Sequence, residues 1–154
     1  MPVAAGVPGI GVPVLKEEGM SYAKQLLDSY PGTLNADAGM LAATIDALSD
    51  CAQACAADAD ADADLSEQNL AEMVKCIRLC LDCVDVCTAT LAVVSRQRDY
   101  DPAVTKPLLQ ACVATCKSCG DECARHAPHY EHCRICEQAC RRCEQACREL
   151  LGIL

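Results

Sequence analysis

Residues 133–147 read CRICEQACRRCEQAC, in which cysteines recur at alternating steps of three and four residues. In an α-helix these steps return to the same side of the helix, so the thiols form one stripe along a helical face. Cysteine here takes the positions where a helical bundle normally carries leucine and isoleucine. The stretch therefore predicts a helix whose buried face is lined with sulfur.

The same spacing recurs elsewhere in this chain of 154 residues and 15 cysteines. One pair of cysteines and two blocks of four precede residues 133–147 in the sequence. The complete set is Cys51 and Cys55; Cys76, Cys80, Cys83 and Cys87; Cys112, Cys116, Cys119 and Cys123; and Cys133, Cys136, Cys140, Cys143 and Cys147. Each stripe is expected to lie on its own helix.

Helix signals flank all four stripes and predict helices over about residues 37–57, 67–96, 102–125 and 129–150. Asp101 followed by Pro102 is typical of an N-cap and first helical position. The acidic run ADADADADLS, residues 57–66, is expected to form a solvated loop with Asp64 or Ser66 as a cap. Short loops between helices favour an all-α, antiparallel up-down-up-down four-helix bundle.

Two parts of the chain differ in character, with residues 1–34 as an extension and residues 35–154 as the cysteine-rich bundle. The extension contains GVPGIGVPVL, whose prolines and glycines favour an extended apolar arm, and a short helix over about residues 21–29. The arm could pack on its own bundle or on a sister subunit. It could also dock on the shell of a protein nanocompartment.

Composition restricts the location and the partners. The number of cysteines is odd, and residues 1–15 lack the basic start and the twin arginine of export signals, so we expect a cytoplasmic protein with reduced thiols. No segment approaches the roughly 20 apolar residues of a membrane span. A net charge of −9 without a basic patch argues against nucleic acid as a partner.

Antiparallel packing predicts that the two ends of the bundle differ. One end should gather the candidate ligands Asn69, Met73, His126, His129 and His132 close to Cys55. The opposite end should gather mostly hydrocarbon, from Met40, Thr90, Val94, Leu109 and Leu150. One end is thus expected to be open to metal ions and the other to be plugged.

Stripes of thiolates favour Cu(I), a soft ion that binds two or three sulfurs. Because a thiolate can bridge two ions, a sulfur-lined tube could hold multiple Cu(I) ions, about one per cysteine. Zinc favours isolated four-ligand sites, and the C-x₂-C-x₂-C run of iron–sulfur proteins is absent from the sequence.

The stripes and the histidine-bearing turn before the last helix resemble the bacterial copper storage proteins over about residues 37–154. The resemblance implies storage of many Cu(I) ions, entry at the histidine-rich end and a homotetramer of the cytosolic type. By position, His126, His129 and His132 match the mouth histidines of the family, and Asn69 could match an oxygen ligand there. A helix over residues 67–96 that is apolar nearly all round is also typical of a subunit interface.

Other interpretations remain open from the sequence. The protein could be a metallothionein-like buffer for Zn(II) or Cd(II), or a thiol redox protein, although a repeated thiol lining offers no single nucleophile and a non-enzymatic role is expected. The cysteines could form disulfides between helices, and the histidines could be polar turn residues. Met73 could be a core residue, and Asn69 could only cap its helix. A copper donor protein is a further expected partner.

Overall fold

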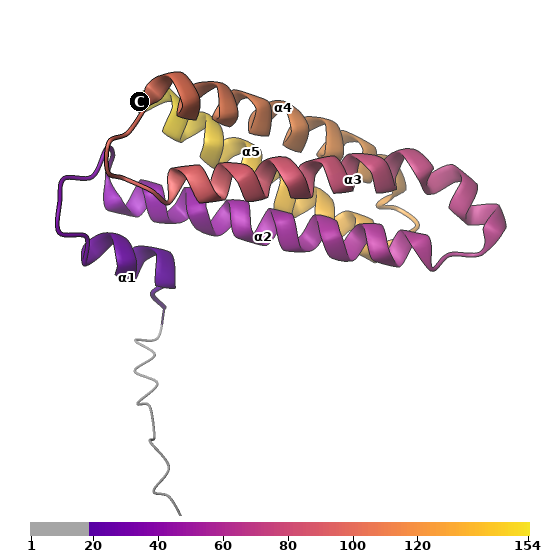
Figure 1. Ribbon diagram of the computed structural model, residues 1–154. Coiled ribbons are helices and arrows are strands. Elements are labelled where there is room, and N and C mark those ends of the chain that lie inside the picture. Colours follow the sequence, from indigo (N-terminus) through magenta and orange to yellow (C-terminus); the bar gives the residue numbers. More distant parts are fainter. Residues whose placement is uncertain (1–18) are drawn as a thin grey trace, which may run out of the picture.

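The structure is a computed structural model that describes residues 19–154. These residues form five α-helices and no strand: α1 (Tyr22–Asp28), α2 (Ala38–Ala63), α3 (Glu67–Val94), α4 (Pro102–His126) and α5 (Glu131–Ile153). Helices α2 to α5 pack as a closed ring in which α2 contacts α3 and α5, and α4 contacts the same two helices. The predicted antiparallel four-helix bundle is confirmed (Figure 1).

The two ends of the bundle carry different connections. The turns from α2 to α3 and from α4 to α5 lie together at one end, whereas α1, the α3–α4 connection and the C-terminus lie at the other (Figure 1). Helix α1 packs only on α2 among the helices, as an addition to the ring. The predicted apolar arm falls mostly within residues 1–18 and so lies outside the described residues.

Local sequence signals set most helix boundaries. The carboxylate of Asp37 accepts a hydrogen bond from Met40 N at the start of α2, and that of Asp101 accepts one from Ala103 N, with Pro102 as the first residue of α4. These side chains satisfy backbone donors that the first helical turn leaves free. The short helix predicted near residues 21–29 is confirmed as α1, and α5 begins two residues later than predicted, at Glu131.

One predicted boundary is wrong. The acidic run was expected to form a loop after residue 57, but α2 continues through it to Ala63, and Asp64 is its C-cap. Alanine, the residue with the highest helix propensity, occupies every second position of the run. The aspartates of the run that lie on the inward face of α2 are buried rather than solvated. The consequence is that Asp58 and Asp62 enter the bundle.

The end of the bundle that carries α1 and the C-terminus is closed by hydrocarbon. Leu48, Leu109 and Leu150 are fully buried there, and Val94 is nearly so. Thr90 Oγ1 donates to Val86 O of its own helix at 2.7 Å, and Thr44 Oγ1 donates to Met40 O of its own helix at 2.9 Å and lies 3.5 Å from Ala146 O of α5. The predicted hydrocarbon plug is therefore present at this end.

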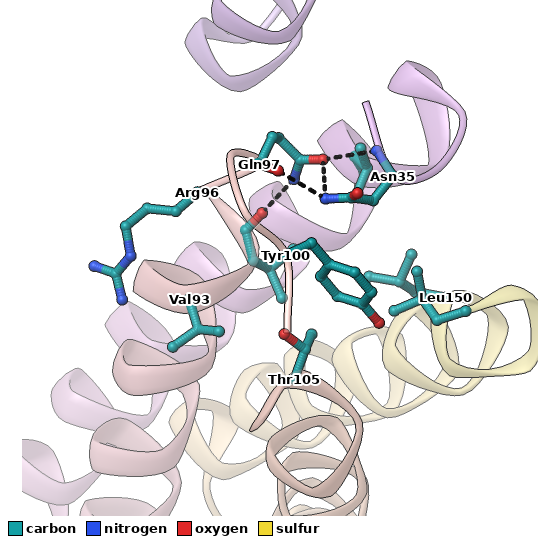
Figure 2. A pocket seen from close by; sticks show the side chains of 10 residues that line it. Asn35, Val93, Arg96, Gln97, Tyr100, Thr105 and Leu150 are labelled. Carbon is teal, nitrogen blue, oxygen red and sulfur yellow. Dashed lines mark hydrogen bonds between the residues drawn. The ribbon is translucent and has the colours of Figure 1, made fainter. Parts of the chain in front are cut away.

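A polar clamp ties the chain segments over this closed end together. The side-chain oxygen of Gln97 accepts a hydrogen bond from Asn35 N at 3.0 Å, and Asn35 Nδ2 donates to Gln97 O at 3.1 Å. Gln97 Nε2 in turn donates to Val94 O (Figure 2). Tyr100 and Leu150 line the small pocket beneath the clamp. The clamp thus joins the segment before α2 to the α3–α4 connection.

Candidate metal centre

All fifteen cysteines point into the bundle, where each is fully buried and free. The stripes predicted from the sequence face one another across the axis, because α2, α3, α4 and α5 each present their three-and-four-residue series inward. The alternative interpretation, that the cysteines form disulfides between helices, does not match the structure, in which all of them are free. The core of the bundle is a column of thiols.

Neighbouring sulfurs follow one another along the whole column. At the closed end Cys147 Sγ lies 3.8 Å from Cys112 Sγ, and in the middle Cys55 Sγ lies 3.5 Å from Cys136 Sγ. Toward the other end Cys76 Sγ lies 3.9 Å from the next sulfur, that of Cys123. A metal–sulfur bond of about 2.3 Å, the length of a zinc–thiolate bond, places two sulfurs on one ion about 3.8–4.0 Å apart. The sulfurs therefore already lie at the spacing that a shared ion requires.

The column divides into overlapping groups of four sulfurs. Within each group all Sγ atoms lie within 4.8 Å of one another. Successive groups share members, so a sulfur can serve two neighbouring sites. The groups include Cys51, Cys83, Cys87 and Cys116; Cys51, Cys55, Cys83 and Cys140; Cys55, Cys119, Cys136 and Cys140; Cys80, Cys119, Cys123 and Cys136; and Cys87, Cys112, Cys116 and Cys143.

Burial and contacts with neighbouring thiols raise the pKa of the last cysteine at each end of the column. Hydrogen bonding to Cys112 and Cys143, together with burial, raises the pKa of the Cys147 thiol. At the opposite end, contact with Cys76, burial and the nearby carboxylates raise the pKa of the Cys133 thiol. Many thiolates cannot coexist in a dry column without cations, because each would repel its neighbours.

A buried carboxylate ends the sulfur column. Asp58, on α2, is 1% exposed, and its Oδ2 accepts hydrogen bonds from Cys80 Sγ at 3.2 Å and from Cys123 Sγ at 3.5 Å. One turn further along α2, Asp62 is fully buried, and its Oδ1 accepts from Cys133 Sγ at 3.6 Å. The two aspartates thus replace cysteines as the lining at this end.

The aspartates meet a histidine that reaches the surface. His132 Nε2 lies 2.9 Å from Asp62 Oδ1 and 3.9 Å from Asp58 Oδ1, and its side chain is 29% exposed. We call Asp58, Asp62 and His132 the mouth. Through Asp62 the mouth places a partly exposed histidine within two contacts of Cys133, at the end of the sulfur column.

The environment of the mouth keeps both carboxyl groups protonated to higher pH than usual. Burial, with the charge of Cys136, raises the pKa of Asp58 to about 6. Burial, with the charge of Asp58, raises the pKa of Asp62 to about 7, although its contact with His132 acts in the opposite direction. Both shifts reflect the cost of placing two negative charges together in a site with little solvent.

The other predicted mouth residues are not paired with Asp58 or Asp62. His126 is 13% exposed and its Nε2 lies 3.1 Å from Glu122 Oε1, which orients the ring. His129 is exposed in the turn before α5, and Asn69 is exposed in the first turn of α3. Met73 is 1% exposed in the core. Of the three histidines, His132 is thus the one that is paired with the aspartates.

Three acidic residues of this end were missed by the sequence reasoning. Asp58 and Asp62 continue the steps of four, three and four that begin at Cys51 and Cys55, so the spacing itself could have identified them. Glu122 is 4% exposed, and no spacing signal marks it. Burial alone would raise the pKa of Glu122, but contacts with His126, Arg125 and Lys75 lower it.

The raised carboxyl pKa values predict a pH dependence of stability for the metal-free protein. A pKa that is higher in the folded state than the unfolded value of 3.8 stabilises the fold at low pH, and this stabilisation is lost as pH rises toward about 7. The variant Asp58→Asn has no carboxyl group to ionise at this position. As pH rises from 4 to 8, its free energy of unfolding should therefore fall by about 1–3 kcal/mol less than that of the wild type. Thermal unfolding of the reduced protein between pH 4 and 8 measures it.

Asp60→Asn is the matched control, since Asp60 lies on the same helix but is exposed. Other acidic groups titrate in the same range, so the informative quantity is the difference between wild type and variant at each pH. An Asp58→Asn profile that runs parallel to that of Asp60→Asn would contradict the assignment.

A helical bundle with a continuous thiol column and a carboxylate–histidine mouth defines a class of metal-binding proteins that hold several ions in one core. A sequence model of the family described as copper storage protein matches residues 37–152. The match covers the whole four-helix bundle apart from its last residues. The chain belongs to the copper storage protein family.

Solved structures of a related protein share the fold. The chain is 54% identical to the copper storage protein Ccsp from Streptomyces lividans in a structure loaded with 10 copper equivalents, with a TM-score of 0.81 over 86% of this chain and 99% of that one. A structure from the same organism, described as copper loading to a cytosolic copper storage protein with five coppers, is 57% identical with a TM-score of 0.71. It covers 75% of this chain and 95% of that one.

A second relative comes from Bacillus subtilis. It is named uncharacterized cysteine-rich protein YhjQ and is 34% identical over 97 residues, which are 63% of this chain and 82% of that protein. The relationship therefore extends beyond one genus. Among the described residues of our chain, no helix is both long and apolar enough to cross a membrane.

Proposed function

We propose that the protein stores and sequesters multiple Cu(I) ions by thiolate coordination inside the bundle. The observation that carries the proposal is the unbroken column of fifteen buried, free cysteines. Thiolates are soft ligands, and Cu(I) is satisfied by two or three of them, so overlapping groups of sulfurs can hold ions in series. The copper-loaded structures of the Streptomyces lividans relative support the same use of the fold.

Filling the column exchanges one positive charge for another. The thiols of the metal-free bundle cannot all ionise together, because thiolates in a dry column repel one another. A thiol must lose its proton to bind a metal, so each Cu(I) ion that enters displaces protons. At one ion per cysteine the net charge of the core stays unchanged, which allows a dry core to accept many ions.

Ions enter and leave at the mouth in this proposal. The opposite end is plugged by fully buried leucines, whereas His132 links the buried aspartates to solvent. His126 and His129 are proposed as further mouth residues, and Met73 and Asn69 as additional ligands. The buried position of Met73 suits this role better than the exposed position of Asn69 does.

Location and partners are also proposals. The relative from Streptomyces lividans is described as cytosolic, and we place this protein in the cytosol as well. A homotetramer is supported by apolar side chains that α3 leaves exposed, among them Val74 and Leu81. A copper donor protein and a nanocompartment shell bound through the N-terminal arm remain predictions from the sequence.

The same column argues against an enzyme. Enzymes with a catalytic cysteine activate one thiol with an adjacent base, whereas this bundle repeats equivalent thiols along its whole length. A metallothionein-like buffer is the nearest alternative, because Zn(II) and Cd(II) also bind thiolates. The identity of the preferred metal distinguishes the two functions.

Competition between the two metals tests the proposed function. Reduced protein is offered excess Cu(I) and Zn(II) together without oxygen, desalted and analysed for both elements. We expect copper to occupy the thiolates and zinc to remain at about one ion per chain or less, since soft sulfur ligands select Cu(I). Retention of several zinc ions per chain would favour the buffer.

A further inference from the structure

The mouth offers a donor set that differs from the sulfur column. It consists of one carboxylate from each of Asp58 and Asp62 and the imidazole of His132, with Cys133 Sγ 3.6 Å from Asp62 Oδ1. Carboxylate oxygen is a poor ligand for Cu(I) but a common one for divalent cations of borderline or hard character. The sulfur column therefore suits Cu(I), whereas the mouth suits a divalent cation.

Two oxygens of this set lack a partner. Asp58 Oδ1 and Asp62 Oδ2 are buried and accept no hydrogen bond. The two residues are 1% and 0% exposed. Burial of a carboxylate oxygen without a donor or a cation is costly. Within residues 19–154, His132 is the only basic side chain paired with either aspartate, since Lys75 and Arg125 pair with Glu122. A bound cation would compensate these oxygens.

Three distances between these donors lie near those around tetrahedral zinc. Zinc bonds of about 2.0–2.2 Å to nitrogen and oxygen place two such donors about 3.3–3.6 Å apart, and a zinc–sulfur bond of about 2.3 Å places sulfur and oxygen about 3.6 Å apart. The distances from His132 Nε2 to Asp62 Oδ1 and Asp58 Oδ1, 2.9 and 3.9 Å, bracket the first value. The distance from Cys133 Sγ to Asp62 Oδ1, 3.6 Å, matches the second.

We propose that the mouth is a binding site for one Zn²⁺ ion per chain, held by Asp58, Asp62 and His132 with Cys133 or water as the fourth ligand. This proposal goes beyond Cu(I) storage and concerns a second, divalent ion. The site lies between the sulfur column and solvent, so an occupied site blocks the route by which Cu(I) enters and leaves. Zinc at the mouth thereby retains copper in the column.

The test measures Zn²⁺ on reduced protein whose thiolates have first been filled with Cu(I), without oxygen. Copper per chain is determined before zinc is added, so a failure of copper storage is recognised separately. Zinc is then titrated against a chromophoric chelator. We expect one Zn²⁺ per chain in the wild type and at least tenfold weaker binding in Asp62→Asn, which keeps the size of the side chain. Removal of copper by a strong chelator should be slower with zinc bound.

Two further variants complete the test. Asp58→Asn should weaken zinc binding as Asp62→Asn does, which guards against a folding defect in one variant. Asp60→Asn is the matched control, because Asp60 lies between the two aspartates on α2 but is exposed, and its zinc binding should equal that of the wild type. If wild type and both aspartate variants bind the same amount of zinc with the same affinity, or if none binds zinc, the site does not exist.

Discussion

A fourfold serine variant in the middle of the column is expected to lose at least about four Cu(I) ions per chain, because each removed thiolate is a ligand that a hydroxyl does not replace for a soft ion. The variant changes Cys55, Cys119, Cys136 and Cys140, which form one of the compact sulfur groups. Serine differs from cysteine by one atom, so the packing of the bundle is largely kept. The loss is measured by anaerobic Cu(I) titration of the reduced variant.

The same variant should also separate the column into two parts. The remaining sulfurs near the mouth are Cys76, Cys80, Cys123 and Cys133, and the remaining close contacts of Cys80 are to Cys123 and to Asp58. On the far side Cys51 keeps its contact with Cys83 at 3.8 Å. Ions that pass from sulfur to sulfur would meet a gap, so loading should become biphasic, with the mouth group filled first. Loading as fast and as complete as in the wild type would contradict a column filled from one end.

Ser118→Ala controls for the effect of mutagenesis on the same helix, since Ser118 is exposed beside the buried Cys119. Its capacity and its loading rate should equal those of the wild type. A comparable loss in this control would show that the fourfold variant reports on folding rather than on ligands.

Truncation of the leucine plug should have the largest effect on the stability of the metal-free protein. Leu109→Ala removes a fully buried side chain at the closed end, which we expect to cost about 2–5 kcal/mol in the free energy of unfolding. The chain contains no Phe or Trp, so few large side chains remain to close the cavity. Chemical denaturation of the reduced protein measures the loss.

Val104→Ala provides the control on the same helix, because Val104 is 52% exposed and should change stability by less than about 0.5 kcal/mol. Cu(I) binds the folded column and so should raise the stability of Leu109→Ala, since a ligand specific for the folded state shifts the equilibrium toward it. If the two alanine variants unfold at the same denaturant concentration, Leu109 is not part of a plug.

The fold was predictable because the cysteine pattern sets the helical period four times. The same pattern identified which face of each helix is buried, and the structure places all fifteen cysteines there. The Asp101–Pro102 signal supplied the start of α4. Here a side chain that is rarely used for packing marked the core more clearly than hydrophobic residues would have done.

The mouth was less predictable, for two physical reasons. The acidic composition of residues 57–66 suggested solvent exposure, although Asp58 and Asp62 continue the three-and-four spacing of Cys51 and Cys55. The direction of a side chain in the first turn of a helix also depends on where that helix begins. His132 faces the aspartates, whereas His129 lies before the start of α5 and is exposed.

A Cu(I) titration of the wild-type protein tests the central claim most directly. Reduced, metal-free protein is titrated without oxygen in the presence of a strong chromophoric chelator, and the absorbance of copper–thiolate charge transfer is followed. Bridging by every thiolate predicts saturation at about one ion per cysteine, with absorbance rising throughout. Saturation at about four ions or fewer would contradict a column filled along its whole length.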